Sequence, residues 1–143
     1  MKKILPGVLV ILLLGSDSPR GHEDTVTEMD ALQGSWLTVS GERNSVAFVV
    51  VGQTETLREG KFTTTNAQGE ITDRGTYFVD LTRRPGLFSE TPAQGAKKGV
   101  KLWYIVQLDG DRLKVGYKGK GTEPPKGFDD TDLTILTCKR IKK

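Results

Sequence analysis

The sequence predicts an all-β fold, an antiparallel barrel of about eight strands, and three observations support this. Short segments rich in β-branched and aromatic residues recur along the chain. Glycines and other turn residues separate most of these segments, and no long amphipathic helical pattern interrupts them. Short strands at regular spacing with turn residues between them are typical of β-sandwiches and barrels.

The expected strands lie in nine ranges. They are 35–40, 46–52, 54–58, 61–65, 71–81, 87–91, 101–108, 112–118 and 132–140. We expect one helical turn over 28–32 to lead into the first strand. Because the length of 143 residues suits one domain, the sequence predicts a single barrel domain over 23–143.

The first 22 residues predict a targeting segment that precedes the fold. Lys2 and Lys3 stand before an apolar run from Ile4 to Leu14, and Gly15 and Ser16 follow it. A basic start, a short apolar stretch and small residues characterise a secretory signal peptide. The run is shorter than the ~20 apolar residues that a membrane-spanning helix needs. We therefore expect 1–22 to be a signal peptide and short linker, and the protein to be exported, periplasmic or extracellular, without a stable membrane anchor.

The charge of the expected mature domain argues against a nucleic-acid partner. The chain has 21 basic and 18 acidic residues. Residues 1–22 hold Lys2, Lys3 and Arg20 of the basic set and Asp17 of the acidic set, which leaves 18 basic and 17 acidic residues and a net charge of +1. Nucleic-acid affinity rests mainly on neutralising phosphates, so a nearly neutral domain favours other partners.

The sharpest local prediction is a hairpin around Asp109 and Gly110. An Asp-Gly pair between two strand patterns favours a two-residue type I′ turn. Such a turn places Val106 opposite Leu113 and directs one uniformly apolar or aromatic set of side chains to the core. The members of this set are Leu102, Tyr104, Val106, Leu113, Val115 and Tyr117.

These six residues would form the wall of a ligand cavity if the barrel is hollow. Four are aliphatic and two are phenols, so the site would be mostly apolar with two hydroxyls to orient a guest. We expect its mouth near Leu102 and Tyr117, with the 119–127 loop as a lid. On the outer face, Trp103 and Ile105 either lie under a neighbouring loop or form a site for a protein partner.

The triplet Gly34-Ser35-Trp36 matches the G-x-W opening of the first strand in lipocalin-like (calycin) barrels, which this chain resembles. The resemblance implies that Gly34, Trp36 and a basic residue late in the last strand, Arg140 or Lys139, close one end of the barrel. A guanidinium suits this place because it stacks on an indole and donates hydrogen bonds to nearby carbonyl groups.

A second resemblance covers most of residues 32–140. The segments 32–36, 75–85, 108–115 and 136–140 look like those of an uncharacterised family of exported lipocalin-like domains of planctomycete bacteria. They stand in the same order as in that family. This resemblance implies the fold and export, and it implies no reaction.

The titratable residues predict no catalytic centre, no metal site and no cofactor. His22 is the only histidine and lies in the expected signal peptide, so histidine-dependent nucleophilic catalysis lacks its base. A common zinc site lacks ligands for the same reason. Cys138 is the only cysteine, which excludes an internal disulfide and suits a buried thiol. Asp129, Asp130 and Asp132 could bind Ca²⁺, although acidic residues at a strand entry are usually only solvated.

Three functions remain open. The first is a non-enzymatic binding module for a small apolar ligand or a protein partner. The second is a structural or interaction protein of the cell envelope with a packed barrel, and the third is a carboxylate-dependent hydrolase. A cavity of ~300 Å³ or more favours the first over the second, whereas inward carboxylates with a raised pKa favour the third.

Overall fold

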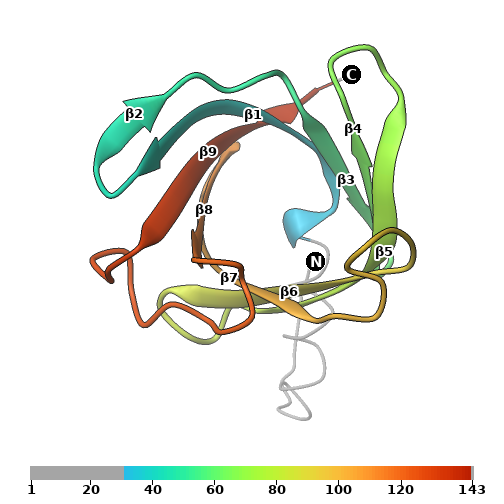
Figure 1. Ribbon diagram of the computed structural model, residues 1–143. Coiled ribbons are helices and arrows are strands. Elements are labelled where there is room, and N and C mark those ends of the chain that lie inside the picture. Colours follow the sequence, from blue (N-terminus) through green and yellow to red (C-terminus); the bar gives the residue numbers. More distant parts are fainter. Residues whose placement is uncertain (1–30, 143) are drawn as a thin grey trace, which may run out of the picture.

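A computed structural model describes residues 31–142, which form a closed antiparallel eight-strand β-barrel with one extra strand (Figure 1). The expected signal peptide over 1–22 lies outside the described residues. Among residues 31–142, no helix has the length and apolar character needed to cross a membrane.

The strands are β1 (Gly34–Arg43), β2 (Val46–Phe48), β3 (Thr54–Arg58), β4 (Lys61–Thr65), β5 (Ile71–Asp80), β6 (Gly86–Pro92), β7 (Leu102–Asp109), β8 (Arg112–Lys118) and β9 (Leu133–Ile141). From β3 onward each strand pairs with the next one in the sequence, β1 pairs with both β2 and β3, and the last strand returns to the first. The ring consists of β1 and β3 to β9, and the pairing of β9 with β1 closes it. The prediction of an all-β barrel is therefore confirmed.

The extra strand β2 explains the largest difference between expected and observed strands. The residues 34–37 of β1 pair with β3, and residues 41–43 of the same edge pair with β2. The chain must pass from one pairing to the other over residues 49–53, which are not in a strand. The expected strand over 46–52 therefore ends at Phe48. Of the helical turn expected over 28–32, residues 31 and 32 are helical and the rest lies outside the described residues.

One end of the barrel is filled by an apolar core. The described chain begins there with Ala31, the next residue Leu32 is fully buried, and in Figure 1 this first turn lies within the ring of strands. The indole Nε1 of Trp36 donates a hydrogen bond of 2.9 Å to the carbonyl oxygen of Leu32, which fixes the turn across the barrel end. The other buried members of this core are Leu57, Phe62, Tyr77, Val79, Phe88, Val106, Leu113 and Cys138.

The hairpin of β7 and β8 has the predicted faces but a different register. Val106 lies opposite Val115 and Leu108 opposite Leu113, so the expected pairing of Val106 with Leu113 is wrong by two residues. The turn residues are Gly110 and Asp111. Gly110 has a φ of +61° whereas Asp111 is not left-handed, which fits a type II′ turn with glycine at its first central position. Since side chains alternate with a period of two, a shift of two residues leaves the same set facing inward.

The outer face of this hairpin is largely covered. Ile105 is 3% exposed. A Cβ added to Gly116 would lie 3.1 Å from the Phe128 ring and 3.2 Å from Ile105, so these two side chains meet above the glycine. Trp103 is half-buried, with the Lys101 ammonium 5.3 Å from its ring centroid. The expected outer patch of Trp103 and Ile105 is thus reduced to Trp103.

Candidate functional site

The structure brings Gly34, Trp36 and Arg140 together at the closed end. The Arg140 guanidinium carbon lies 4.3 Å from the Trp36 ring centroid. Its Nη1 donates a hydrogen bond of 2.6 Å to the carbonyl of Gln33, and its Nη2 donates one of 2.9 Å to that of Ala31. Gly34, with a φ of +123°, leaves room for the guanidinium, because a Cβ there would lie 3.2 Å from Nη1. This end is therefore sealed by contacts between the first and last strands.

A carboxylate holds the guanidinium in place from outside. Asp111, in the β7–β8 turn, forms ion pairs with Arg140 at 3.2 Å and with Lys142 at 2.7 Å. The hydrogen bond from Lys142 is the main reason why the pKa of Asp111 lies below its usual value, and Arg140 adds to it. The shifted hairpin register thus places a turn residue where it contacts the last strand.

A cavity of about 560 Å³ lies in the barrel between this core and the opposite end. All six residues that the hairpin pattern directs inward line it: Leu102, Tyr104, Val106, Leu113, Val115 and Tyr117. Residues from the loops at the opposite end also line it, among them Gln53, Lys97, Lys120 and Gly121. The mouth is therefore at the end where β7 begins and β8 ends.

Three carboxylates that the sequence analysis did not select also line the cavity: Glu55, Asp73 and Glu90. Glu55 on β3 lies opposite Thr64 on β4, and Thr64 lies opposite Asp73 on β5. The two acids are thus two strands apart in one row, roughly 10 Å between their backbones. Glu90 is on the next strand, β6. These three acids make the cavity more polar than the mostly apolar site with two phenols that the sequence predicted.

Two of these carboxyl groups each have a buried oxygen without a hydrogen-bond partner among the described residues. Glu90 is 8% exposed, and its Oε2 has no hydrogen-bond partner among the described residues. The Oε2 of Glu55 is also buried and lacks a partner. Burial raises the pKa of Glu55 to about 8, and the nearby charge of Asp73 adds to this effect. An unpaired buried carboxyl group costs free energy, so its presence requires a reason other than stability.

Aromatic side chains lie beside these acids and across the barrel from Glu55. Tyr77, Phe88, Tyr104 and Tyr117 stand on four successive strands, with ring centroids 5.6, 5.7 and 5.9 Å apart along the series, and the last three of them line the cavity. In a ring of eight strands, β7 with Tyr104 lies across from β3 with Glu55. Burial is the main cause that raises the pKa of the Tyr104 hydroxyl, and the charges of Glu55 and Asp73 contribute. The phenol and the acids therefore share one enclosed space.

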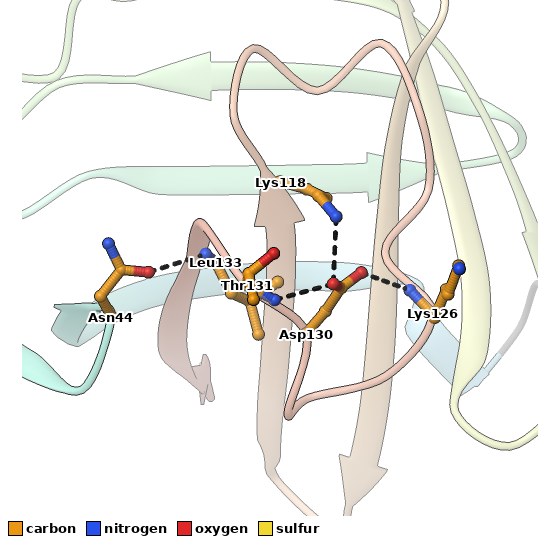
Figure 2. Close-up of polar contacts among 6 residues, drawn as sticks. All are labelled: Asn44, Lys118, Lys126, Asp130, Thr131 and Leu133. Carbon is orange, nitrogen blue, oxygen red and sulfur yellow. Dashed lines mark hydrogen bonds and ion pairs between the residues drawn. The ribbon is translucent and has the colours of Figure 1, made fainter.

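The loop between β8 and β9 borders the mouth and is tied down by Asp130 (Figure 2). The Asp130 carboxylate accepts hydrogen bonds from the backbone N–H groups of Lys126 at 3.0 Å and Thr131 at 2.7 Å, and it pairs with the Lys118 ammonium at 3.0 Å. These contacts, the Lys126 bond first, lower the pKa of Asp130 to about 2. The expected lid is thus a loop with fixed ends, of which Gly119 to Gly121 line the cavity.

Two of the acidic residues of this loop have basic partners. Asp132 pairs with Arg43 at 2.6 Å, and Asp130 pairs with Lys118. In the part of the chain that the structure describes, no group of three or more histidine, cysteine, aspartate or glutamate side chains is placed to hold a metal ion. Cys138 is a buried free thiol in the barrel wall, 3.7 Å from the Thr38 hydroxyl.

The sequence contained a signal for the missed acids. Along a strand, residues two apart face the same side. Glu55 stands two residues before Leu57, and Glu90 two residues after Phe88, so each acid shares the inward face of a core residue. What no local pattern could show is which strands face each other across the barrel.

Comparison with models of protein families, with curated proteins and with solved structures finds no significant match. Membership of the family of exported domains that the sequence resembles therefore stays a prediction. The cavity is the feature of the structure that bears on function.

Proposed function

We propose that this protein is an exported, non-enzymatic binding module that holds one small molecule inside its barrel. The observation that carries the proposal is the cavity of about 560 Å³, which lies within the ~300–1,000 Å³ typical of sites for small ligands. One end of the barrel is sealed by the Trp36–Arg140 contact, and a mouth lies at the other, so a guest enters and leaves by one route.

A packed barrel with a purely structural role in the cell envelope is less favoured. Protein interiors are close-packed and hold few voids larger than a water molecule. A barrel that only supports itself gains nothing from a cavity of this size or from the unpaired carboxyl groups in its wall. Of the two outer residues expected to bind a protein partner, Trp103 remains partly accessible and Ile105 is covered.

Titration with an environment-sensitive apolar dye tests the binding module. We expect saturation at one site per chain. Val115→Trp should abolish binding because the indole would occupy the cavity that Val115 lines. Gln107→Trp is the matched control: Gln107 is exposed on β7, outside the set that lines the cavity, and this variant should bind as the original protein does.

The outcomes of this titration separate the functions. Saturable binding that is lost in Val115→Trp and kept in Gln107→Trp, with both variants folded by circular dichroism, supports a carrier. Dye binding that does not saturate, or that survives Val115→Trp in a folded protein, leaves the packed structural barrel as the better explanation.

The second candidate, a carboxylate-dependent hydrolase, is favoured by the raised pKa of Glu55, which suits a proton donor near neutral pH. A hydrolytic carboxylate pair flanks the bond that it cleaves. Here Glu55, Asp73 and Glu90 lie on β3, β5 and β6 and leave the facing wall aromatic, so binding is the better proposal. Release of nitrophenol from chromogenic glycosides or esters, abolished by Glu55→Gln, would reverse this preference.

A further inference from the structure

The cavity has two walls of opposite chemical character. Three carboxyl groups, those of Glu55, Asp73 and Glu90, are confined to the strands from β3 to β6. The aromatic wall consists of Tyr104 and Tyr117 on β7 and β8, with Tyr104 across the barrel from Glu55. A guest that satisfies both walls at once must carry a hydrogen-bond donor on one side and an apolar surface on the other.

The acids lie above an apolar floor. Glu55 is one inward position nearer the mouth than Leu57, and Glu90 is one inward position nearer the mouth than Phe88. Leu57 and Phe88 belong to the core that fills the closed end. A ligand that enters through the mouth therefore reaches the carboxyl groups before it reaches the packed floor.

We propose that the ligand is a small amphipathic amine, whose ammonium group binds Glu90 and the neighbouring acids while its apolar body packs on the aromatic wall. This inference rests on the proposed binding function and specifies its ligand. The observation that points to a ligand is Glu90, which lines the cavity, is 8% exposed and has an unpartnered oxygen. An ammonium group in the cavity beside Glu90 supplies hydrogen-bond donors and a compensating charge to the carboxyl group.

The charges around the cavity favour a cation over an anion. Its three carboxyl groups are set against two lysines, Lys97 and Lys120, and both of these are exposed in loops at the mouth. An anionic guest would have to keep its charged group at this rim and bury its apolar part beside the acids. A cation meets the carboxyl groups inside, where the effective dielectric constant is lower and the pairing stronger. Glu55, whose pKa is raised to about 8, adds a counter-charge only once it has lost its proton.

The apolar body is supported by the composition of the facing wall. Tyr104 and Tyr117 present aromatic rings in an edge-to-face arrangement, and Leu102 and Val115 flank them on the same hairpin. Ring faces also attract cations, so an amine attached to a flat apolar group fits this wall better than a compact inorganic cation. The lack of a metal-binding group among the described residues agrees with an organic cation.

Isothermal titration calorimetry at pH 7 with three indoles of one shape tests the charge of the ligand. Tryptamine carries an ammonium group, 3-ethylindole is neutral and indole-3-propionate carries a carboxylate. We expect tryptamine to bind roughly 10- to 100-fold more tightly than 3-ethylindole, the range for a hydrogen bond to a charged group, and indole-3-propionate to bind most weakly.

Two variants locate the effect. Glu90→Gln should remove most of the preference for tryptamine and leave the affinity for 3-ethylindole unchanged. Glu123→Gln removes the same charge from an exposed loop position outside the set that lines the cavity, and it should change neither affinity. A folded Glu90→Gln variant that keeps the full preference would overturn the role of Glu90.

Failure of this inference differs from failure of the proposed function. If 3-ethylindole or indole-3-propionate binds as tightly as tryptamine, the barrel is a carrier of another ligand class and the amine is refuted. Tight binding of the anion alone would place its carboxylate at Lys97 and Lys120. If no indole binds and the apolar dye does not bind either, the binding function itself falls.

Discussion

At the scale of single residues, Trp36 and Arg140 hold the closed end. Trp36 is 2% exposed and bonded to Leu32, so Trp36→Ala should lower the free energy of unfolding by ~3–5 kcal/mol, as for other buried large aromatic residues. Arg140→Ala should cost less, ~1–2 kcal/mol for a partly buried cation–π contact with its hydrogen bonds. Urea denaturation of both single variants and the double variant measures the coupling between them.

The sign of the coupling free energy between Trp36 and Arg140 decides whether the two side chains stabilise each other. Because the guanidinium stacks on the indole, the double variant should lose less than the sum of the single losses. Lys139→Ala is the control, since Lys139 is exposed on the same strand. Additive losses would mean that Arg140 acts through its bonds to Gln33 and Ala31 and its ion pair with Asp111, and not through the indole.

Glu55 predicts a pH dependence of stability. Burial raises the pKa of Glu55 to about 8 in the folded protein, whereas the usual pKa of a glutamate is 4.5. Between pH 4.5 and about pH 8, Glu55 binds a proton in the folded state and not in the unfolded state. The contribution of Glu55 to the free energy of unfolding is therefore fully present below about pH 4.5 and is lost as the pH rises to about 8. At ~1.4 kcal/mol per pKa unit, the total effect is on the order of a few kcal/mol.

Chemical denaturation at pH 5 and pH 8.5 measures this effect. The free energy of unfolding should fall between the two pH values by a larger amount in the original protein than in Glu55→Gln, whose amide does not titrate. Glu123→Gln controls for loss of an exposed acid. The same pH dependence in Glu55→Gln as in the original protein would show that Glu55 ionises normally in the fold.

At the scale of elements, the faces of the β7–β8 hairpin predict opposite results for neighbouring substitutions. Val106 is 1% exposed in the core, so Val106→Asp buries a charge and should unfold the domain or lower its denaturation midpoint strongly. Gln107 is exposed, and Gln107→Asp should change the midpoint little. Comparable shifts in the two midpoints would be incompatible with the assigned faces.

The same hairpin marks the limit of prediction from sequence. Alternation of apolar and polar residues determines which side chains face inward, and this prediction was right. It cannot distinguish registers that differ by two residues, since both give the same faces. Two residues favour the observed register. Gly110 has the positive φ that the first central position of a type II′ turn needs, and Asp111 forms an ion pair with Arg140 in this register. That ion pair joins residues far apart in the sequence.

At the scale of the whole molecule, the barrel has a sealed half and an open half. The motif residues Gly34 and Trp36 and the late Arg140 belong to the sealed half, and the resemblance to lipocalin-like barrels located them because their spacing is characteristic. The carboxyl groups that line the cavity belong to no motif. Glu55 meets Tyr104 only because β3 and β7 lie across from each other in a closed ring of eight strands. Closure of the sheet into a ring therefore creates the candidate site. Local sequence patterns predict single strands and their faces well, but they predict this closure least.

The whole-molecule prediction concerns export. The Lys2-Lys3 start and the short apolar run predict removal of the N-terminus. Intact-mass measurement of protein recovered from the periplasm or medium should therefore show a start between about residues 16 and 24. Leu12→Arg, which interrupts the apolar run, should accumulate as an uncleaved precursor in the cell. Recovery of the original protein in the membrane fraction with Met1 intact would refute cleavage and favour an anchored protein. The mouth of the barrel would then open into the compartment on whose side of the membrane the anchor holds the barrel.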